Sequence, residues 1–134
     1  MGGVQKNKKK KVAIKDYVSW FEILAIDFQQ AVDFYNHIFD ITMEQNRTEV
    51  NAMAFFPVTS GIGGGIVAGP GYVPSDHGPL LYLNAGEDLN DVLNKVEEVG
   101  GRIVMPKTLI TEEMGYFAIF IDSQGNKLAL YSKN

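Results

Sequence analysis

The apolar positions of this chain form one helical pattern that occurs twice, 61 positions apart. In both copies apolar residues recur at i, i+3, i+4 and i+7, which lines one face of an α-helix. The first copy contains Phe28, Ala31, Val32, Tyr35 and Ile38, and the second contains Leu89, Val92, Leu93, Val96 and Val99. Asp27 and Asp88 stand directly before them as natural N-caps, and Gln30 completes a capping-box spacing with Asp27. The pattern predicts helices over residues 28–39 and 89–99.

Apolar runs on both sides of these helices predict strands. One run precedes each helix, at Tyr17–Ile26 and Pro79–Asn84. Further strands are expected at Ile41–Thr48, Asn51–Val58, a short glycine-rich stretch within 60–71, Arg102–Pro106, Tyr116–Asp122 and Asn126–Ser132. The order strand, helix and three strands therefore occurs twice, in a first module of about residues 15–70 and a second of about 78–134. A unit this short cannot bury its sheet face alone, so the two copies are expected to enclose a space in which function resides.

Composition narrows the class of protein. The chain has 134 residues, of which 46% are hydrophobic, and this suits one globular domain over residues 15–134. No segment approaches the roughly 20 apolar residues of a membrane span, and no secretory signal is visible. The absence of cysteine excludes disulfides, thiolate nucleophiles and cysteine-ligated metal centres. A cytoplasmic location is expected.

The charge is unevenly distributed. The net charge is −4, but five of the twelve basic residues are lysines within the first eleven positions. The remaining chain has seven basic residues against 16 acidic ones, which argues against a nucleic-acid-binding face. Residues 1–14 are expected to form a flexible basic N-terminal arm.

The glycine-rich stretch Ser60–Gly71 does not fit a phosphate-binding loop. No Lys-Ser or Lys-Thr pair follows it, and no helix is expected to begin there. Glycines within a strand more often mark a bulge, a bend or the close approach of another group.

Five segments of the chain are similar to a known family. They are Val18–Ile23, Asp27–Phe39, Gly78–Asn84, Gly100–Lys107 and Gly115–Ser132. The first contains W-F-E-I, and the last is a long hairpin with a D-S-x-G-N turn, which makes it the most specific. Through these segments the chain resembles the vicinal oxygen chelate superfamily, which includes glyoxalase I, bleomycin-resistance proteins and extradiol dioxygenases. The resemblance implies an α+β fold of two βαβββ modules in tandem, with curved mixed sheets around a pocket, and a homodimer.

The ligands of the family metal are missing from this sequence. Family enzymes hold a divalent metal with His, Gln and Glu side chains on inward-facing strands, and the metal polarises two substrate oxygens. The corresponding positions here are Trp20, Leu81 and Ala129. No Asp, Glu, His or Cys lies between Asn51 and Ser75, within Pro79–Asn84 or within Asn126–Ser132. Glu22 is the one strong donor left, so no metal or other cofactor is predicted.

The resemblance instead places organic-ligand chemistry in the pocket. Strand alternation puts Trp20 and Glu22 on one face, with Ala129 and Tyr131 on the corresponding face of the last strand. With Leu81 as an apolar wall, this set suits a flat or cationic molecule held by stacking, cation–π attraction and one charge-assisted hydrogen bond.

Three functions follow from these residues. The first is a metal-independent protein that binds a small organic molecule, as resistance proteins do when they sequester a toxic compound. The second is an enzyme, a lyase, isomerase or dioxygenase-like catalyst, in which Glu22 is the general acid or base. The third is a domain that acts through protein contacts, with its pocket filled by its own side chains. Neither a nucleic acid nor a membrane is an expected partner.

Overall fold

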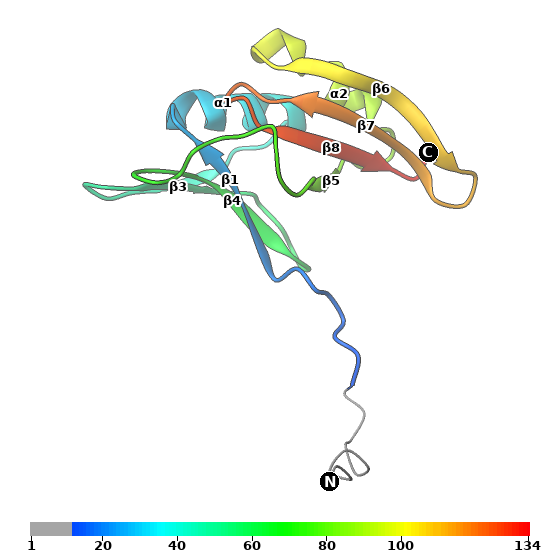
Figure 1. The fold of residues 1–134 in the computed structure, drawn as a ribbon, viewed down its shortest axis with the longest axis horizontal. Helices are drawn as coiled ribbons and strands as arrows, with labels where there is room; N and C mark the ends of the chain where they lie inside the picture. The colour runs from blue at the N-terminus through cyan, green and yellow to red at the C-terminus, as the bar shows by residue number, and fades with distance from the viewer. Residues whose placement is uncertain (1–11) are drawn as a thin grey trace, which may run out of the picture.

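Two four-stranded sheets and the helices between them make up the folded body (Figure 1). The structure is a computed structural model that describes residues 12–134. The arm expected over residues 1–14 therefore lies largely outside the described residues. Among those described, no helix is both long enough and apolar enough to cross a membrane.

The first module has the predicted order of elements. It comprises β1 (Trp20–Ala25), α1 (Phe28–Phe39), β2 (Glu44–Arg47), β3 (Ala52–Phe55) and β4 (Gly63–Ala68). These strands form sheet A in the order β1-β4-β3-β2, with β1 parallel to β4 and the other pairs antiparallel. The predicted bounds of the first helix are confirmed, and the Asp27 side chain accepts the Gln30 backbone N–H at 3.1 Å, as an N-cap does.

The second module repeats this topology as sheet B. It comprises β5 (Tyr82–Asn84), α2 (Asn90–Leu93), the 3-10 helix η2 (Glu97–Val99), β6 (Arg102–Thr111), β7 (Gly115–Ile121) and β8 (Lys127–Ser132). The strand order is β5-β8-β7-β6, with β5 parallel to β8. The fold class is therefore the α+β arrangement of two βαβββ modules in tandem with curved sheets.

The second helix is shorter than its pattern predicts. Residues 89–99 keep the amphipathic spacing, but only Asn90–Leu93 is α-helical. From Lys95 to Val99 the backbone bonds run from residue i to residue i−3, as between Val96 and Leu93 at 3.1 Å, which is the 3-10 pattern. The segment ends where expected, at Gly100 with a φ of 92°.

One face of each sheet is packed against the helices, and we call this face the helix side. In sheet A it carries Ile23, Ala54 and Ile66, and in sheet B it carries Ala118, Phe120 and Leu130. All six belong to one hydrophobic cluster that also contains the buried residues of α1 and α2. Helix α1 contacts both modules, because its Phe34 stacks on Phe120 of β7 at 6.1 Å between ring centroids. The helix sides of the two sheets therefore share one core.

A turn of module two fastens the modules together. The side-chain Oε1 of Gln124 accepts the backbone N–H groups of Ile26 and Asp27, at 2.9 and 2.8 Å. Its Nε2 donates to Oε1 of Gln30 at 2.7 Å, so Gln124 takes the place of the second half of the capping box. Asn126 donates from Nδ2 to the carbonyl of Leu24 at 2.7 Å. The D-S-x-G-N turn, Asp122–Asn126, thus holds the junction of β1 and α1.

Asp122 anchors this turn from inside the core. Its Oδ1 accepts the backbone N–H groups of Gln124 and Asn126, at 2.8 and 2.9 Å. Its Oδ2 accepts the hydroxyl of Tyr35 on α1 at 2.7 Å. Burial, with the charge of Asp122 and this hydrogen bond, raises the pKa of Tyr35 well above its usual value. A buried polar contact between the modules therefore fixes their orientation.

Removing the Tyr35 hydroxyl is expected to weaken the attachment between modules. Tyr35→Phe should lower the free energy of unfolding by about 1–2 kcal/mol, because Asp122 stays buried but loses one of its donors. Urea denaturation of the two proteins measures the change. Tyr17→Phe is the control, since the Tyr17 side chain is 88% exposed and its loss of a hydroxyl should leave the stability unchanged.

Candidate functional site

Among the described residues, no helix packs against the second face of either sheet, and we call it the open face. In sheet A, strand alternation places Trp20, Glu22 and Leu24 on the open face of β1. The residues of β4 and β3 that share this face are Gly63, Gly65, Val67, Met53 and Phe55. Because α1 lies on the other side of the sheet, no part of the described chain, residues 12–134, forms a second layer over this face.

The indole of Trp20 lies across β4 because glycines leave room for it. A Cβ atom added at Gly63 would stand 3.1 Å from Cζ3 of the indole, and one added at Gly65 would stand 3.5 Å from Cζ2. The ring centroid of Phe55 on β3 is 6.2 Å from that of Trp20. Trp20 is nevertheless 41% exposed, which is high for so large a ring on a strand. The result is an aromatic surface open to solvent.

Glu22 lies at the edge of this surface. Its Oε2 accepts the indole N–H of Trp20 at 3.3 Å, and its side chain is exposed. Glu44 on β2 occupies the same row of the sheet, because Glu22 pairs with Gly65, Gly65 with Phe55, and Phe55 with Glu44. The open face of sheet A therefore combines aromatic rings with two carboxylates.

The open face of sheet B is also aromatic. Tyr82 on β5 and Phe117 on β7 approach each other across β8, with 6.3 Å between ring centroids. Ala129 lies between them on β8 and is completely buried, whereas Tyr82 is 52% exposed. Tyr131 shares this face, and its hydroxyl donates to the carbonyl of Met114. Lys127 and Arg102 stand in one row with Ile121 at the end of the face, which makes that end basic.

Within one chain the two open faces point away from each other, because the helix sides share the core. Four of the five residues predicted for the ligand site lie on these faces, Trp20 and Glu22 on sheet A and Ala129 and Tyr131 on sheet B. One subunit does not bring the two pairs together. The sequence argument also did not identify Phe55, Tyr82 and Phe117, although strand alternation from Glu22 and Ala129 would have placed them on the same faces.

Leu81 lies on the wrong face for the wall that we expected it to form. The prediction carried the 61-residue offset from Trp20 into the strand, but Tyr82 is the residue that pairs with Ala129. In burial, Ile23 of β1 corresponds to Leu83 of β5, and Ala25 corresponds to Ala85. Within the strands the offset between the modules is therefore 60 residues, not 61. The connection between strand and helix is one residue longer in module two and includes Gly86 with a φ of 83°. Leu81 therefore points to the helix side.

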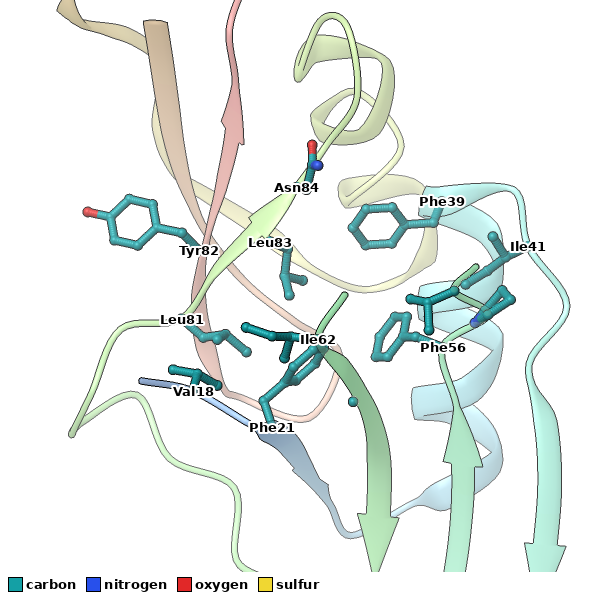
Figure 2. A pocket seen from close by; sticks show the side chains of 13 residues that line it. Val18, Phe21, Phe39, Ile41, Phe56, Ile62, Leu81, Tyr82, Leu83 and Asn84 are labelled. Carbon is teal, nitrogen blue, oxygen red and sulfur yellow. The ribbon is translucent and has the colours of Figure 1, made fainter. Parts of the chain in front are cut away.

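On the helix side, Leu81 lines a cavity of about 470 Å³ between the modules (Figure 2). Phe21, Phe39 and Phe56 form the wall from module one, and Leu81 and Leu83 form the wall from module two. A smaller groove of about 400 Å³ runs along the free edge of β1, where Glu22, Lys127 and His77 line it.

A protein-family model matches most of this chain. The model of the glyoxalase/bleomycin resistance protein/dioxygenase superfamily matches residues 17–130. The chain belongs to this superfamily. A search of curated proteins found no significant match.

Solved structures of the superfamily are similar to this chain. A glyoxylase/bleomycin resistance protein/dioxygenase domain from Frankia sp. EAN1pec has a TM-score of 0.67 at 16% identity, and the match covers 89% of this chain and 98% of that one. A family enzyme from Burkholderia phytofirmans PsJN has a TM-score of 0.62 at 17% identity, with 87% and 98% covered. Glyoxalase I from Zea mays has a TM-score of 0.65 at 16% identity, and the match covers 85% of this chain but only 43% of the maize enzyme. These likenesses show the fold.

The donor set of this superfamily member does not fit a divalent metal centre. Such a centre needs three or four oxygen or nitrogen donors that converge on the ion. On the four strands β1, β4, β5 and β8, the open faces offer one carboxylate, Glu22, and one amide, Asn84, whose Oδ1 already accepts the backbone N–H of Gly86. Among residues 12–134, no cluster of three His, Asp or Glu side chains is placed to hold an ion. No step of a reaction is therefore derived through a metal.

The contact between Trp20 and Glu22 has a direct spectroscopic test. The chain has one tryptophan, so its indole N–H gives a single resonance in a ¹H–¹⁵N spectrum. Glu22→Ala should move this resonance upfield, because the N–H loses its carboxylate acceptor. Glu44→Ala removes a carboxylate from the same face without touching the indole, and should leave the resonance in place.

Proposed function

We propose that this superfamily member is a homodimer that binds a small organic molecule between the open face of sheet A in one subunit and the open face of sheet B in the other. The observation that carries the proposal is the pair of aromatic open faces, neither of which is covered by residues 12–134 of its own chain. Trp20 and Tyr82 are 41% and 52% exposed on these faces. Contiguous apolar surface of this kind marks an interaction site.

Charge favours the pairing of sheet A with sheet B over the pairing of like faces. The open face of sheet A carries Glu22 and Glu44, and that of sheet B carries Arg102 and Lys127. Two A faces or two B faces would bring like charges together, which opposes association. A twofold axis lets A cover B of the partner while B covers A of the partner, and the dimer closes with two identical pockets.

The side chains of such a pocket favour a flat ligand with a positive group. Trp20 and Phe55 from one subunit, with Tyr82 and Phe117 from the other, offer ring faces for stacking and cation–π attraction. Glu22 would anchor the positive group by a charge-assisted hydrogen bond. Ligand binding in this proposal needs no metal, in accord with the donor set of the open faces.

An enzyme that uses Glu22 as general acid or base is the alternative proposal. It is favoured by the position of Glu22 as the only carboxylate on the four strands that would line the pocket.

Glu22→Gln separates the two proposals. A binding protein would lose affinity for a cationic ligand, whereas an enzyme would lose turnover and keep much of its affinity.

A charge on the open face of sheet B should break the dimer. Phe117→Asp is expected to raise the dimer dissociation constant on the order of a hundredfold, because it removes a buried ring from the interface and places a carboxylate there. Sedimentation velocity over a range of protein concentrations measures the effect. Val50→Asp is the control, since Val50 is 64% exposed in the connection between β2 and β3 and lies on neither open face. A wild-type chain that stays monomeric at high concentration would contradict the proposal.

A mixing experiment tests whether each pocket is shared between subunits. Thioflavin T, a flat fluorescent cation, serves as the probe. Trp20→Ala impairs the sheet A half of every pocket, and Tyr82→Ala impairs the sheet B half, so either variant alone should bind the probe weakly. After subunit exchange of equal amounts, half of the dimers are mixed and each has one intact pocket, so about a quarter of the sites should recover wild-type affinity. If mixing restores no binding, the site is not shared between subunits.

A further inference from the structure

The cavity on the helix side is a feature that the proposed function does not use. It has a volume of about 470 Å³, within the range of small-molecule sites in proteins. It lies between the two modules and opens to solvent at one side. Figure 2 shows Phe39, Phe56, Leu83 and Ile62 directed toward one another around it.

The aromatic wall of the cavity is held in place by its own contacts. The ring of Phe56 lies 5.6 Å from that of Phe21 and 6.2 Å from that of Phe39, between centroids. Its third neighbour is Tyr35, at 5.7 Å, and the hydroxyl of Tyr35 is fixed by Asp122. Edge-to-face and tilted packing of this kind restricts ring motion. These contacts hold the three rings of the wall against one another around the cavity.

The side chains around the cavity carry no charge. The two lining residues with polar side-chain atoms are Tyr82 and Asn84. In Figure 2 the Tyr82 ring points away from the cavity, and the Asn84 amide lies at its upper edge. Oδ1 of Asn84 already accepts the backbone N–H of Gly86 at 3.1 Å. A charged ligand would lose its hydration here without gaining a partner, so the lining selects an uncharged molecule.

Sheet A separates this cavity from the open face. Neighbouring residues of β1 point to opposite sides, Trp20 to the open face and Phe21 to the cavity. The glycines of β4 do the same, because a Cβ atom at Gly64 would come within 2.3 Å of the Phe21 ring while one at Gly63 would approach Trp20. A ligand in the cavity and a ligand on the open face would therefore touch different side chains of sheet A.

We propose that the helix-side cavity is a second binding site, which takes an uncharged, largely aromatic small molecule. Its rim gives access from solvent, since Val18, Val58 and Ile62 are 47%, 56% and 37% exposed. Affinity at this site comes from burial of apolar surface and from contact with the rings of Phe21, Phe39 and Phe56. The proposal does not depend on dimer formation or on Glu22.

The test uses the whole chain and N-phenyl-1-naphthylamine, a neutral flat dye whose fluorescence rises when it leaves water. The dye should bind saturably with one site per chain. Ile62→Trp fills the cavity and Ile62→Glu places a charge in it, so both should weaken binding on the order of tenfold or more. Val58→Glu repeats the charge test on the exposed rim, where an effect on folding is least expected.

Met53→Glu is the matched control, because Met53 lies on the same sheet but faces the other side. Its dye affinity should stay within about twofold of wild type. Circular dichroism confirms that each variant is folded. Absence of saturable dye binding overturns the inference, as does binding that survives both Ile62 substitutions. Dye binding that is lost in Met53→Glu and Trp20→Ala would place the dye on the open face, which overturns the second site and leaves the proposed function standing.

Discussion

The attachment of the turn Asp122–Asn126 to the junction of β1 and α1 fixes how the two modules pack against each other. Gln124 satisfies backbone donors at the start of α1, Asn126 satisfies a carbonyl at the end of β1, and Asp122 bonds to Tyr35 in the core. These contacts hold α1 between the modules, with Phe34 stacked on Phe120. Both helix sides are then buried in one core, and both open faces are left to solvent.

Under the proposed function, this arrangement requires two chains to form one pocket. The two halves of the predicted ligand site lie on opposite outer faces, with opposite charge and similar aromatic content. In the proposed dimer, each subunit would therefore contribute half of each of two sites. The helix-side cavity differs, because both of its walls come from one chain and its lining contains no charged residue.

The sequence was sufficient for the repeat, the element order and most of the open-face residues, because these depend on local periodicity. The bounds of α1 and its Asp27 cap followed directly from the apolar spacing. The short length of α2 did not follow from this spacing, because the 3-10 helix Glu97–Val99 has the same apolar pattern as an α-helix. Leu81 was misplaced because a single extra residue before α2 inverts the facing of β5. The outward orientation of the open faces depends on contacts between Tyr35 and Asp122, 87 positions apart, which no local pattern encodes.

The run Gly63–Gly65 in β4 separates two spaces with a wall one strand thick. A side chain that replaces Gly64 would clash with the Phe21 ring at 2.3 Å and displace it, while one that replaces Gly63 would press on the Trp20 indole at 3.1 Å. A substitution at either position is therefore expected to act first on the ring of its own compartment. If both proposed sites exist, this partition allows their specificities to change separately.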